Sequence, residues 1–424
     1  MHDLRALREN ADAIRDGLRR RGKLDALGPI VDRALAADVE RRTLIQAVEE
    51  RKAARNAASQ EVARRKKARE SADDLIEQTR ALGAEIARLE TELASAEAEI
   101  ERMLFELPNS PLPDVPAGGE DDGRLLRAWG TPREGNDLKP HWDLGTALGI
   151  LDLARGAKIT GSGFVVFRGV GARLTRGLLS MMIDVHVRDH GYEEVWVPFL
   201  VNRATATTTG QLPKFEDDMY VVKDDDLYLV PTAEVPVTSL HRDEMLDGAE
   251  LPKAYVCYTP CFRREAGAHG KDTRGLLRVH QFDKVELVRL TSPEDAGAQH
   301  ELLTSHAEKI LQLLELPYRV KMLAAGDTGF SSAKTYDLEV WAPGVRAWLE
   351  VSSCSTFTDF QARRGGIRYR PARGEKPRLV HTLNGSGLAL PRTIAALLEH
   401  HQRPDGSIAV PPALRPYLGA DTLA

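Results

Sequence analysis

The chain has 424 residues, in which 58 lysines and arginines stand against 63 aspartates and glutamates, for a formal net charge of -5. This length is enough for about two or three domains. The small net charge excludes a global signal for nucleic acid, so any such contact must be a local basic patch. The N-terminal residues lack an apolar signal core and no long apolar run follows, which predicts no membrane contact.

The N-terminal quarter of the chain, residues 1–110, is predicted to form long helices, because it is poor in glycine and aromatic residues and rich in Ala, Glu and Arg. Its second half carries an apolar seam whose steps alternate between four and three residues, the spacing of a coiled coil. The seam consists of Leu75, Leu82, Ile86, Leu89, Leu93, Ala96, Ile100, Met103 and Leu107.

An upstream helix supplies a matching seam that Arg51 and Arg55 interrupt. Between the two helices, the segment from Ala68 to Asp74 contains Ser71 and two aspartates, a composition that favours a turn and a helix N-cap. We therefore predict an antiparallel helical hairpin, a coiled coil about 50 Å long, since about 33 residues rise 1.5 Å each.

Charge is unevenly distributed on this hairpin, because residues 51–69 are strongly basic while the second helix is acidic. A solvated helix face and a surface that grips a phosphate backbone explain the basic run equally well. The cations that would contact a phosphate backbone or face solvent are Arg51, Lys52, Arg55, Arg64, Arg65, Lys66, Lys67 and Arg69.

A linker follows the helices, where four prolines and a Gly-Gly pair lie between residues 108 and 119. This predicts a domain at 1–110 and a second at 111–424. The second mixes short β-rich runs with helices but lacks regular βαβ alternation, so we expect an α+β domain around an antiparallel β-sheet rather than a Rossmann fold.

The cysteines Cys257, Cys261 and Cys354 are the three in the chain. So small and odd a number fits a reducing cytoplasm and argues against a disulfide framework. We expect core thiols, because a metal site would need more Cys or His partners.

The most informative segment of the second domain is residues 262–286, in which two charge-rich stretches flank a Gly-rich loop. Arg263 and Glu265 lie two apart, so on a strand they would point to the same face. Phe282 and Glu286 follow Arg278 at spacings of four. An arginine for a phosphate, an aromatic ring for a base and a carboxylate for an ammonium or hydroxyl can line one nucleotide site.

Four further segments have patterned polar residues: His-Gly-Tyr-Glu-Glu-Val-Trp-Val-Pro at 190–198, Thr-Ala-Glu at 232–234, Glu-Val-Ser-Ser-Cys-Ser at 350–355, and His-Thr-Leu-Asn-Gly-Ser-Gly at 381–387 with Arg392 beyond it. Taken singly, each is a weak signal. Within the third segment, Glu350 and Ser353 lie three apart, and their hard oxygens suit a shared magnesium ion.

Together these segments resemble the class II aminoacyl-tRNA synthetases, and their residue sequences are similar to those of bacterial-type seryl-tRNA synthetases. Residues 190–198 resemble motif 1, which builds the dimer interface in that family, 262–286 resemble motif 2, and 381–392 resemble motif 3. The resemblance implies a cytoplasmic homodimer that uses Mg²⁺ with ATP. Zinc is not expected, because the Cys and Glu ligands of the zinc-dependent seryl enzymes are not found.

The resemblance also implies a role for each residue. Arg263, Glu265 and Arg392 are the catalytic set: Arg263 for the α-phosphate and the serine carboxylate, Glu265 for the adenine amine and Arg392 for the γ-phosphate. The implied serine-binding residues are Thr232, Ala233, Glu234, Arg263, Glu286, Asn384 and Ser386. The implied ATP-binding residues are Arg263, Arg264, Glu265, Val279, Phe282, Glu350, Val351, Ser352, Ser353 and Arg392, with Glu350 and Ser353 as magnesium ligands.

The implied activity is a serine–tRNA ligase, which makes seryl-adenylate from L-serine and ATP and transfers serine to tRNA(Ser), and to tRNA(Sec) where it exists. One alternative is a duplicated paralogue that serves antibiotic self-resistance or charges a carrier protein, although carrier-charging relatives are expected to lack a basic arm. Another is a non-enzymatic coiled-coil scaffold, which the intact Arg263, Glu286 and Arg392 disfavour.

Overall fold

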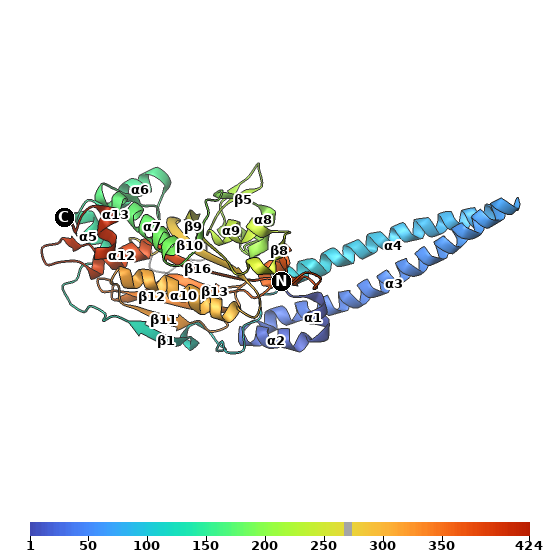
Figure 1. The fold of residues 1–424 in the computed structure, drawn as a ribbon, viewed down its shortest axis with the longest axis horizontal. Helices are drawn as coiled ribbons and strands as arrows, with labels where there is room; N and C mark the ends of the chain where they lie inside the picture. The colour runs from blue at the N-terminus through green and yellow to red at the C-terminus, as the bar shows by residue number, and fades with distance from the viewer. Residues whose placement is uncertain (267–273) are drawn as a thin grey trace. The chain divides into compact units, whose positions relative to one another are not determined.

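The computed structural model describes residues 1–266 and 274–424. The centre of the Gly-rich loop expected within 262–286 therefore lies outside the described residues. The described chain divides into two compact units, Met1–Pro108 and Asn109–Ala424 (Figure 1). None of the helices in these ranges combines the length and the apolar composition that a membrane span requires.

The first unit is helical, and its two longest helices run antiparallel as the predicted coiled-coil hairpin (Figure 1). Two short helices complete a small core at the open end of the hairpin, where Leu7, Leu18, Val31 and Met103 are buried together. Short helices are marginal alone, so this burial stabilises them. The helices are α1 (Leu4–Glu9), α2 (Ala11–Arg20), α3 (Leu24–Ala68) and α4 (Asp73–Glu106).

The turn between α3 and α4 lacks the side-chain N-cap that the sequence predicts. Arg69 ends α3 in the left-handed region, with φ 60°, and Ala72 is the N-cap of α4 without any side-chain hydrogen bond. The Ser71 hydroxyl instead donates to the Asp73 carboxylate at 3.0 Å. Asp73 and Asp74 fall in the first turn of α4, where negative charge is stabilised by the helix dipole.

One of the two cations that interrupt the predicted seam, Arg51, forms an ion pair between the two helices, as does its neighbour Lys52. Arg51 Nε lies 2.9 Å from Glu85 Oε1, and Lys52 Nζ lies 2.7 Å from Glu90 Oε1. Charge pairing across the hairpin therefore accompanies the apolar seam, in the way that flanking charges accompany a coiled-coil core.

The second unit is built on an eight-stranded sheet in the order β1-β11-β12-β13-β16-β10-β9-β4. Neighbouring strands are antiparallel except β4 and β9, which confirms the predicted α+β class. The strands are β1 (Arg124–Trp129), β4 (Glu193–Glu194), β9 (Lys253–Phe262), β10 (Gln281–Thr291), β11 (Tyr318–Met322), β12 (Lys334–Ala342), β13 (Ala347–Thr356) and β16 (His381–Ala389).

Shorter elements surround this sheet. The helices are α5 (His141–Ala147), α6 (Leu153–Thr160), α7 (Val170–Arg188), α8 (Arg203–Thr209), α9 (Glu234–Thr238), α10 (Ala296–Leu313), α11 (Phe360–Gly365), α12 (Leu390–His400) and α13 (Arg415–Leu418). The small strands are β2 (Leu151–Asp152), β3 (Val166–Phe167), β5 (Leu200–Asn202), β6 (Val221–Val222), β7 (Leu227–Leu229), β8 (Met245–Asp247), β14 (Arg368–Arg370), β15 (Arg378–Leu379), β17 (Ile408–Ala409) and β18 (Thr422–Leu423).

Strand β10 shows how the sheet acquires one apolar face and one polar face. Successive side chains of a strand point to opposite faces. Val285 and Leu287 are fully buried in the main core, whereas Phe282, Lys284 and Glu286 line a pocket on the other face. One strand thus contributes to the core and to the candidate site at once.

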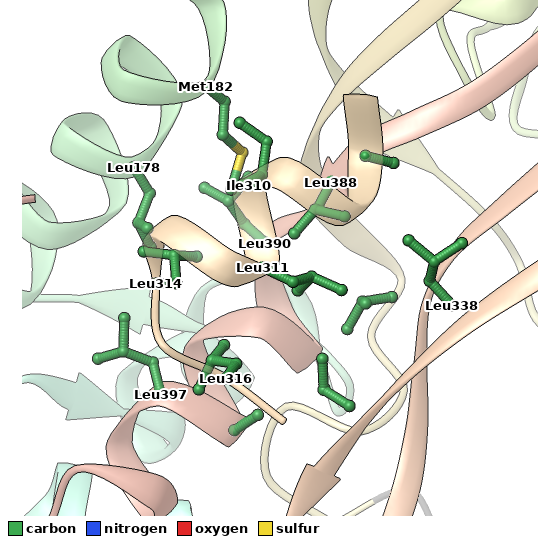
Figure 2. Packing of buried hydrophobic residues seen from close by; sticks show 14 of the residues in the cluster. Leu178, Met182, Ile310, Leu311, Leu314, Leu316, Leu338, Leu388, Leu390 and Leu397 are labelled. Atoms are coloured by element: carbon green, nitrogen blue, oxygen red, sulfur yellow. The ribbon is translucent and has the colours of Figure 1, made fainter. Parts of the chain in front are cut away.

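Helices α7, α10 and α12 supply the layer that packs on the apolar face. Figure 2 shows Leu178 and Met182 of α7 beside Ile310 of α10, with Leu397 of α12 in the same cluster. Each fully buried side chain of this kind contributes about 1.5–3 kcal/mol through loss of apolar surface to water. The three cysteines of the second unit are free and buried, as predicted for core thiols.

We predict that Leu311→Ala lowers the free energy of unfolding by about 2–5 kcal/mol, because Leu311 is fully buried in this layer and its loss leaves a cavity. Leu302→Ala, on the exposed side of the same helix, is the matched control, with a change within about 0.5 kcal/mol. Urea denaturation of the full chain measures both. Equal losses would contradict the assignment of the core.

Candidate active site

A pocket of about 650 Å³ opens on the polar face of the sheet. Strands β10, β13 and β16 form its floor, and the segments on either side of residues 267–273 form one wall. The sequence-predicted residues that line it are Thr232, Glu234, Arg263, Glu265, Val279, Phe282, Glu286, Glu350, Val351, Ser353, Asn384, Ser386 and Arg392. Segments far apart in the sequence therefore meet here.

Three predicted residues are not among the lining side chains that the structure describes. Ala233 is buried in a neighbouring apolar cluster. The Ser352 hydroxyl points away from the pocket and donates to the Ser386 carbonyl at 2.7 Å. Arg264 is exposed, and its backbone N–H donates to the Asp218 carbonyl at 2.9 Å.

The expectation that Arg263 and Glu265 share a strand face is wrong. The β9–β10 ladder ends where Phe262 pairs with Gln281, so both residues lie in the connection beyond the strand. Glu265 has φ 52°, in the left-handed region that non-glycine residues adopt only at some energetic cost. Its carboxylate pairs with the Arg278 guanidinium, which joins the two sides of the connection.

An aromatic and cationic surface lies next to this ion pair. The Arg263 guanidinium lies 5.2 Å from the centroid of the Phe282 ring, within cation–π range. Val279 is buried beside it. A planar base can stack on such a surface. The Arg263 Nε donates to the Pro231 carbonyl at 3.3 Å, and its terminal N–H groups can meet an anion.

Midway along β10, two polar side chains of the pocket lie opposite each other. Glu286 and Ser386 are direct partners in the β10–β16 ladder, so their side chains lie on the same face. Thr232, which precedes α9, has its hydroxyl 3.4 Å from the Glu286 carboxylate. Lys284, which sequence reasoning missed, pairs with Glu286 and donates to the Thr232 hydroxyl at 2.7 Å.

A second buried carboxylate, that of Glu234, begins α9. Burial, reinforced by the negative charge of Glu286, raises the pKa of Glu234 to about 7. A hydrogen bond from Gln361 of α11 partly offsets this rise in pKa, since Gln361 Nε2 donates to Glu234 Oε1 at 2.6 Å. Gln361 in turn accepts from the Thr382 hydroxyl at 2.6 Å, which fixes its orientation.

Oxygen ligands gather at the β12–β13 edge of the pocket. Ser353 Oγ lies 2.6 Å from Asp337 Oδ1 and 2.9 Å from Glu350 Oε1. Burial, with the nearby charge of Glu350, raises the pKa of Asp337 well above its ordinary value. Groups of three or more His, Cys, Asp or Glu fit to hold a metal do not occur in the described ranges. Magnesium needs no such group, since one or two carboxylates plus phosphate oxygens and water suffice.

Arg392 closes this end of the pocket from the first turn of α12. Its Nε donates to the Leu277 carbonyl at 2.9 Å, and its Nη1 donates to the Glu350 carbonyl at 2.9 Å. The guanidinium is thereby held beside the candidate metal ligands. A polyphosphate bound here would contact this cation and any metal ion that Glu350 and Ser353 held.

Sequence reasoning missed Lys284, Asp337 and Gln361. A signal existed for Lys284, because a period of two from Phe282 to Glu286 places it on the same strand face. Asp337 and Gln361 had none, since they reach the site from β12 and α11 through long-range pairing.

Comparisons with known proteins agree along the whole chain. The family model "Seryl-tRNA synthetase N-terminal domain" matches residues 1–111, and "tRNA synthetase class II core domain (G, H, P, S and T)" matches residues 214–401. A curated serine–tRNA ligase from Gemmatimonas aurantiaca is 62% identical over 425 residues and covers 100% of both chains.

Two solved structures are also similar. The seryl-tRNA synthetase from Pyrococcus horikoshii complexed with ATP has a TM-score of 0.94 at 38% identity, covering 100% of this chain and 99% of its own. The cytoplasmic serine–tRNA ligase from Naegleria fowleri in complex with AMP has a TM-score of 0.88 at 28% identity, covering 100% and 98%.

The raised pKa of Glu234 predicts a pH-dependent penalty on stability. Below the ordinary glutamate pKa of 4.5 both folded and unfolded chains hold the proton; between 4.5 and about 7 only the folded chain holds it, so stability falls as pH rises through this window. We expect Glu234→Gln to remove this loss, so that the variant gains stability over the parent from about pH 5 to about pH 8. Urea midpoints at both pH values test this, with exposed Glu375→Gln as the control. A pH-independent difference would contradict the burial argument.

Proposed function

The chain belongs to the seryl-tRNA synthetase family of class II aminoacyl-tRNA synthetases, and from that membership we propose how its pocket and hairpin serve a serine–tRNA ligase. The resemblance drawn from the motifs is confirmed by the two family models and the full-length relatives. The observation that carries the proposal is the pocket itself, which joins a nucleotide surface at Phe282 to a hydroxyl-binding pair at Glu286 and Ser386.

In the activation step, a serine carboxylate oxygen attacks the α-phosphorus of ATP. A new oxygen–phosphorus bond forms, the bond to the bridging oxygen breaks, and pyrophosphate leaves. Arg263 contacts the α-phosphate and the serine carboxylate, and Arg392 binds the γ-phosphate. Phe282 stacks on adenine, whose amine meets Glu265. Positioning and cationic stabilisation supply the catalysis, so no side-chain nucleophile is required.

Magnesium fits the oxygen set of Glu350 and Ser353, and when bound with ATP it neutralises phosphate charge. The fit rests on the 2.9 Å separation of these two side-chain oxygens at the pocket rim. Asp337 lies behind Ser353, and its hydrogen bond of 2.6 Å with the Ser353 hydroxyl holds that oxygen in place.

Selectivity for serine follows from the burial of its hydroxyl-binding groups. Glu286 and Ser386 receive the substrate hydroxyl, with Asn384 beside them, while Thr232 and Glu234 hold the ammonium. A site built to bond a hydroxyl rejects a substrate that lacks one by roughly 10⁴-fold or more, because the buried polar groups are then left unpaired. Alanine is excluded in this way.

The hairpin serves as the tRNA-binding arm, and its ion pairs sort the basic run into two sets. Four cations have carboxylate neighbours within the hairpin: Arg51, Lys52, Arg64 and Arg65. The remaining four form no ion pair with any carboxylate that the structure describes: Arg55, Lys66, Lys67 and Arg69. The second set presents net charge to a phosphate backbone.

The same proposal covers the partners of the enzyme. It acts in the cytoplasm as a homodimer through residues 190–198, where Trp196 is 71% exposed on a monomer, as an interface aromatic would be. The arm favours tRNA(Ser) over a carrier protein as acceptor, and tRNA(Sec) is served where it exists. A paralogue in antibiotic self-resistance would share this chemistry.

We predict that Glu286→Gln lowers kcat/KM for serine in ATP–pyrophosphate exchange by at least about tenfold, because a hydrogen bond to a charged group is lost. ATP binding should persist, since Phe282 and Arg392 are untouched. Glu375→Gln, at an exposed position, is the control. Exchange within about twofold of the parent would remove Glu286 from the serine site.

The arm is tested by neutralising equal numbers of charges from the same basic run. Replacing the four unpaired cations with Gln should raise KM for tRNA(Ser) and reduce the salt dependence of binding by up to about one log unit for each phosphate that the arm no longer binds. Replacing the four paired cations should have the smaller effect. Serine-dependent pyrophosphate exchange should be unchanged in both variants. Unchanged tRNA affinity in both would show that the arm does not bind tRNA.

A further inference from the structure

Lys284 is a buried cation inside the pocket, and neither motif resemblance nor the activation step gives it a role. It lies between Phe282 and Glu286 on the pocket face of β10 and is 6% exposed. Its Nζ donates to Thr232 Oγ1 at 2.7 Å and pairs with the Glu286 carboxylate. A lysine is seldom buried without such partners, so these two contacts account for its position.

The hydrogen-bonding capacity of Thr232 is taken up by this arrangement. Its hydroxyl accepts from Lys284 at 2.7 Å and from the Glu234 backbone N–H at 3.2 Å, and its one hydrogen faces Glu286 at 3.4 Å. A hydroxyl offers one donor and two lone pairs. A substrate ammonium can therefore bond to Thr232 only by replacing one of these two donors. If it replaces Lys284, the lysine keeps its ion pair with Glu286.

The pairing changes what Glu286 can bind. An unpaired buried carboxylate attracts any cation strongly, because the surroundings screen charge poorly. With Lys284 beside it, Glu286 is neutralised but keeps lone pairs that can accept a hydrogen bond from an uncharged hydroxyl. A substrate whose side chain ended in an ammonium would instead bring a like charge against Lys284.

The charge count of the amino-acid site supports this. Glu234 and Glu286 are the two carboxylates at this end of the pocket, and Lys284 is the cation between them. The α-ammonium of serine adds a second positive charge, whose attraction favours ionisation of the Glu234 carboxyl, and the four groups are then in balance. A side-chain ammonium would add a third positive charge without a partner, and such an imbalance is costly in a buried site.

We propose that Lys284 is a specificity-determining residue that makes Glu286 an acceptor for a hydroxyl and excludes the amine analogue of serine, L-2,3-diaminopropionate. The inference rests on the proposed activation of serine and deepens it, because it concerns discrimination by charge. Exclusion of alanine needs only Glu286, whereas exclusion of a side-chain cation needs Lys284 as well.

The test compares kcat/KM for serine and for L-2,3-diaminopropionate in ATP–pyrophosphate exchange by the full chain. The assay uses the most acidic pH at which the parent activates serine, so that both amino groups of the analogue are protonated. In Lys284→Gln, which keeps a donor but removes the charge, the preference for serine should fall by at least about tenfold. Lys284→Arg keeps the charge and should retain the preference of the parent.

A second neutral variant and a binding readout separate charge from folding. Lys284→Met should show the same loss of preference as Lys284→Gln, and protection against thermal unfolding by each amino acid without ATP should report it independently of catalysis. An unchanged ratio in a neutral variant that still binds ATP overturns the role of Lys284. A parent that fails to activate serine overturns the proposed function itself, so the two failures are distinguishable.

Discussion

The antiparallel pairing of β10 with β16 is the contact on which both the core and the pocket depend. Glu286 faces Ser386 only because the register shifts by one residue after Val285, which leaves Gly387 as the extra residue of a bulge. A Cβ at Gly387 would come within 2.7 Å of His186 Nε2, so glycine suits this position. A slip of one residue along this ladder would exchange the polar and apolar faces of β10.

Charge is balanced locally, although the net charge of -5 reveals nothing of this. In the pocket, the ammonium of Lys284 offsets the charge of Glu286. Burial raises the pKa of Glu234 to about 7, so its carboxyl is neutral below that pH. On the hairpin, Glu85 and Glu90 form ion pairs with Arg51 and Lys52, which the sequence alone does not distinguish from the unpaired cations of the basic run. The net positive charge of the basic run on the hairpin therefore rests with the cations that have no carboxylate partner among the described residues.

In the function that we propose, amino-acid activation and tRNA binding rely on different kinds of interaction. Activation takes place in a pocket with buried polar groups, where each hydrogen bond discriminates strongly between substrates. In the same proposed function, contact with tRNA relies on exposed cations such as Lys66 and Lys67, which are screened by salt and carry little sequence information. Discrimination among amino acids therefore resides in few residues, whereas tRNA affinity is distributed over many.

The sequence by itself determined the hairpin and the α+β class, and its resemblance to a known family indicated most of the residues that line the pocket, because heptad spacing and the motifs around Phe282, Glu286 and Arg392 are local patterns. It did not determine the end of β9, since that depends on where pairing with β10 stops, and so the strand face expected for Arg263 and Glu265 was wrong. Asp337 and Gln361 join the site through β12 and α11, and only tertiary pairing brings such distant residues within hydrogen-bonding distance. The tertiary structure likewise decided which cations of the arm are paired, because an ion pair depends on the distance between side chains on separate helices rather than on their order in the chain.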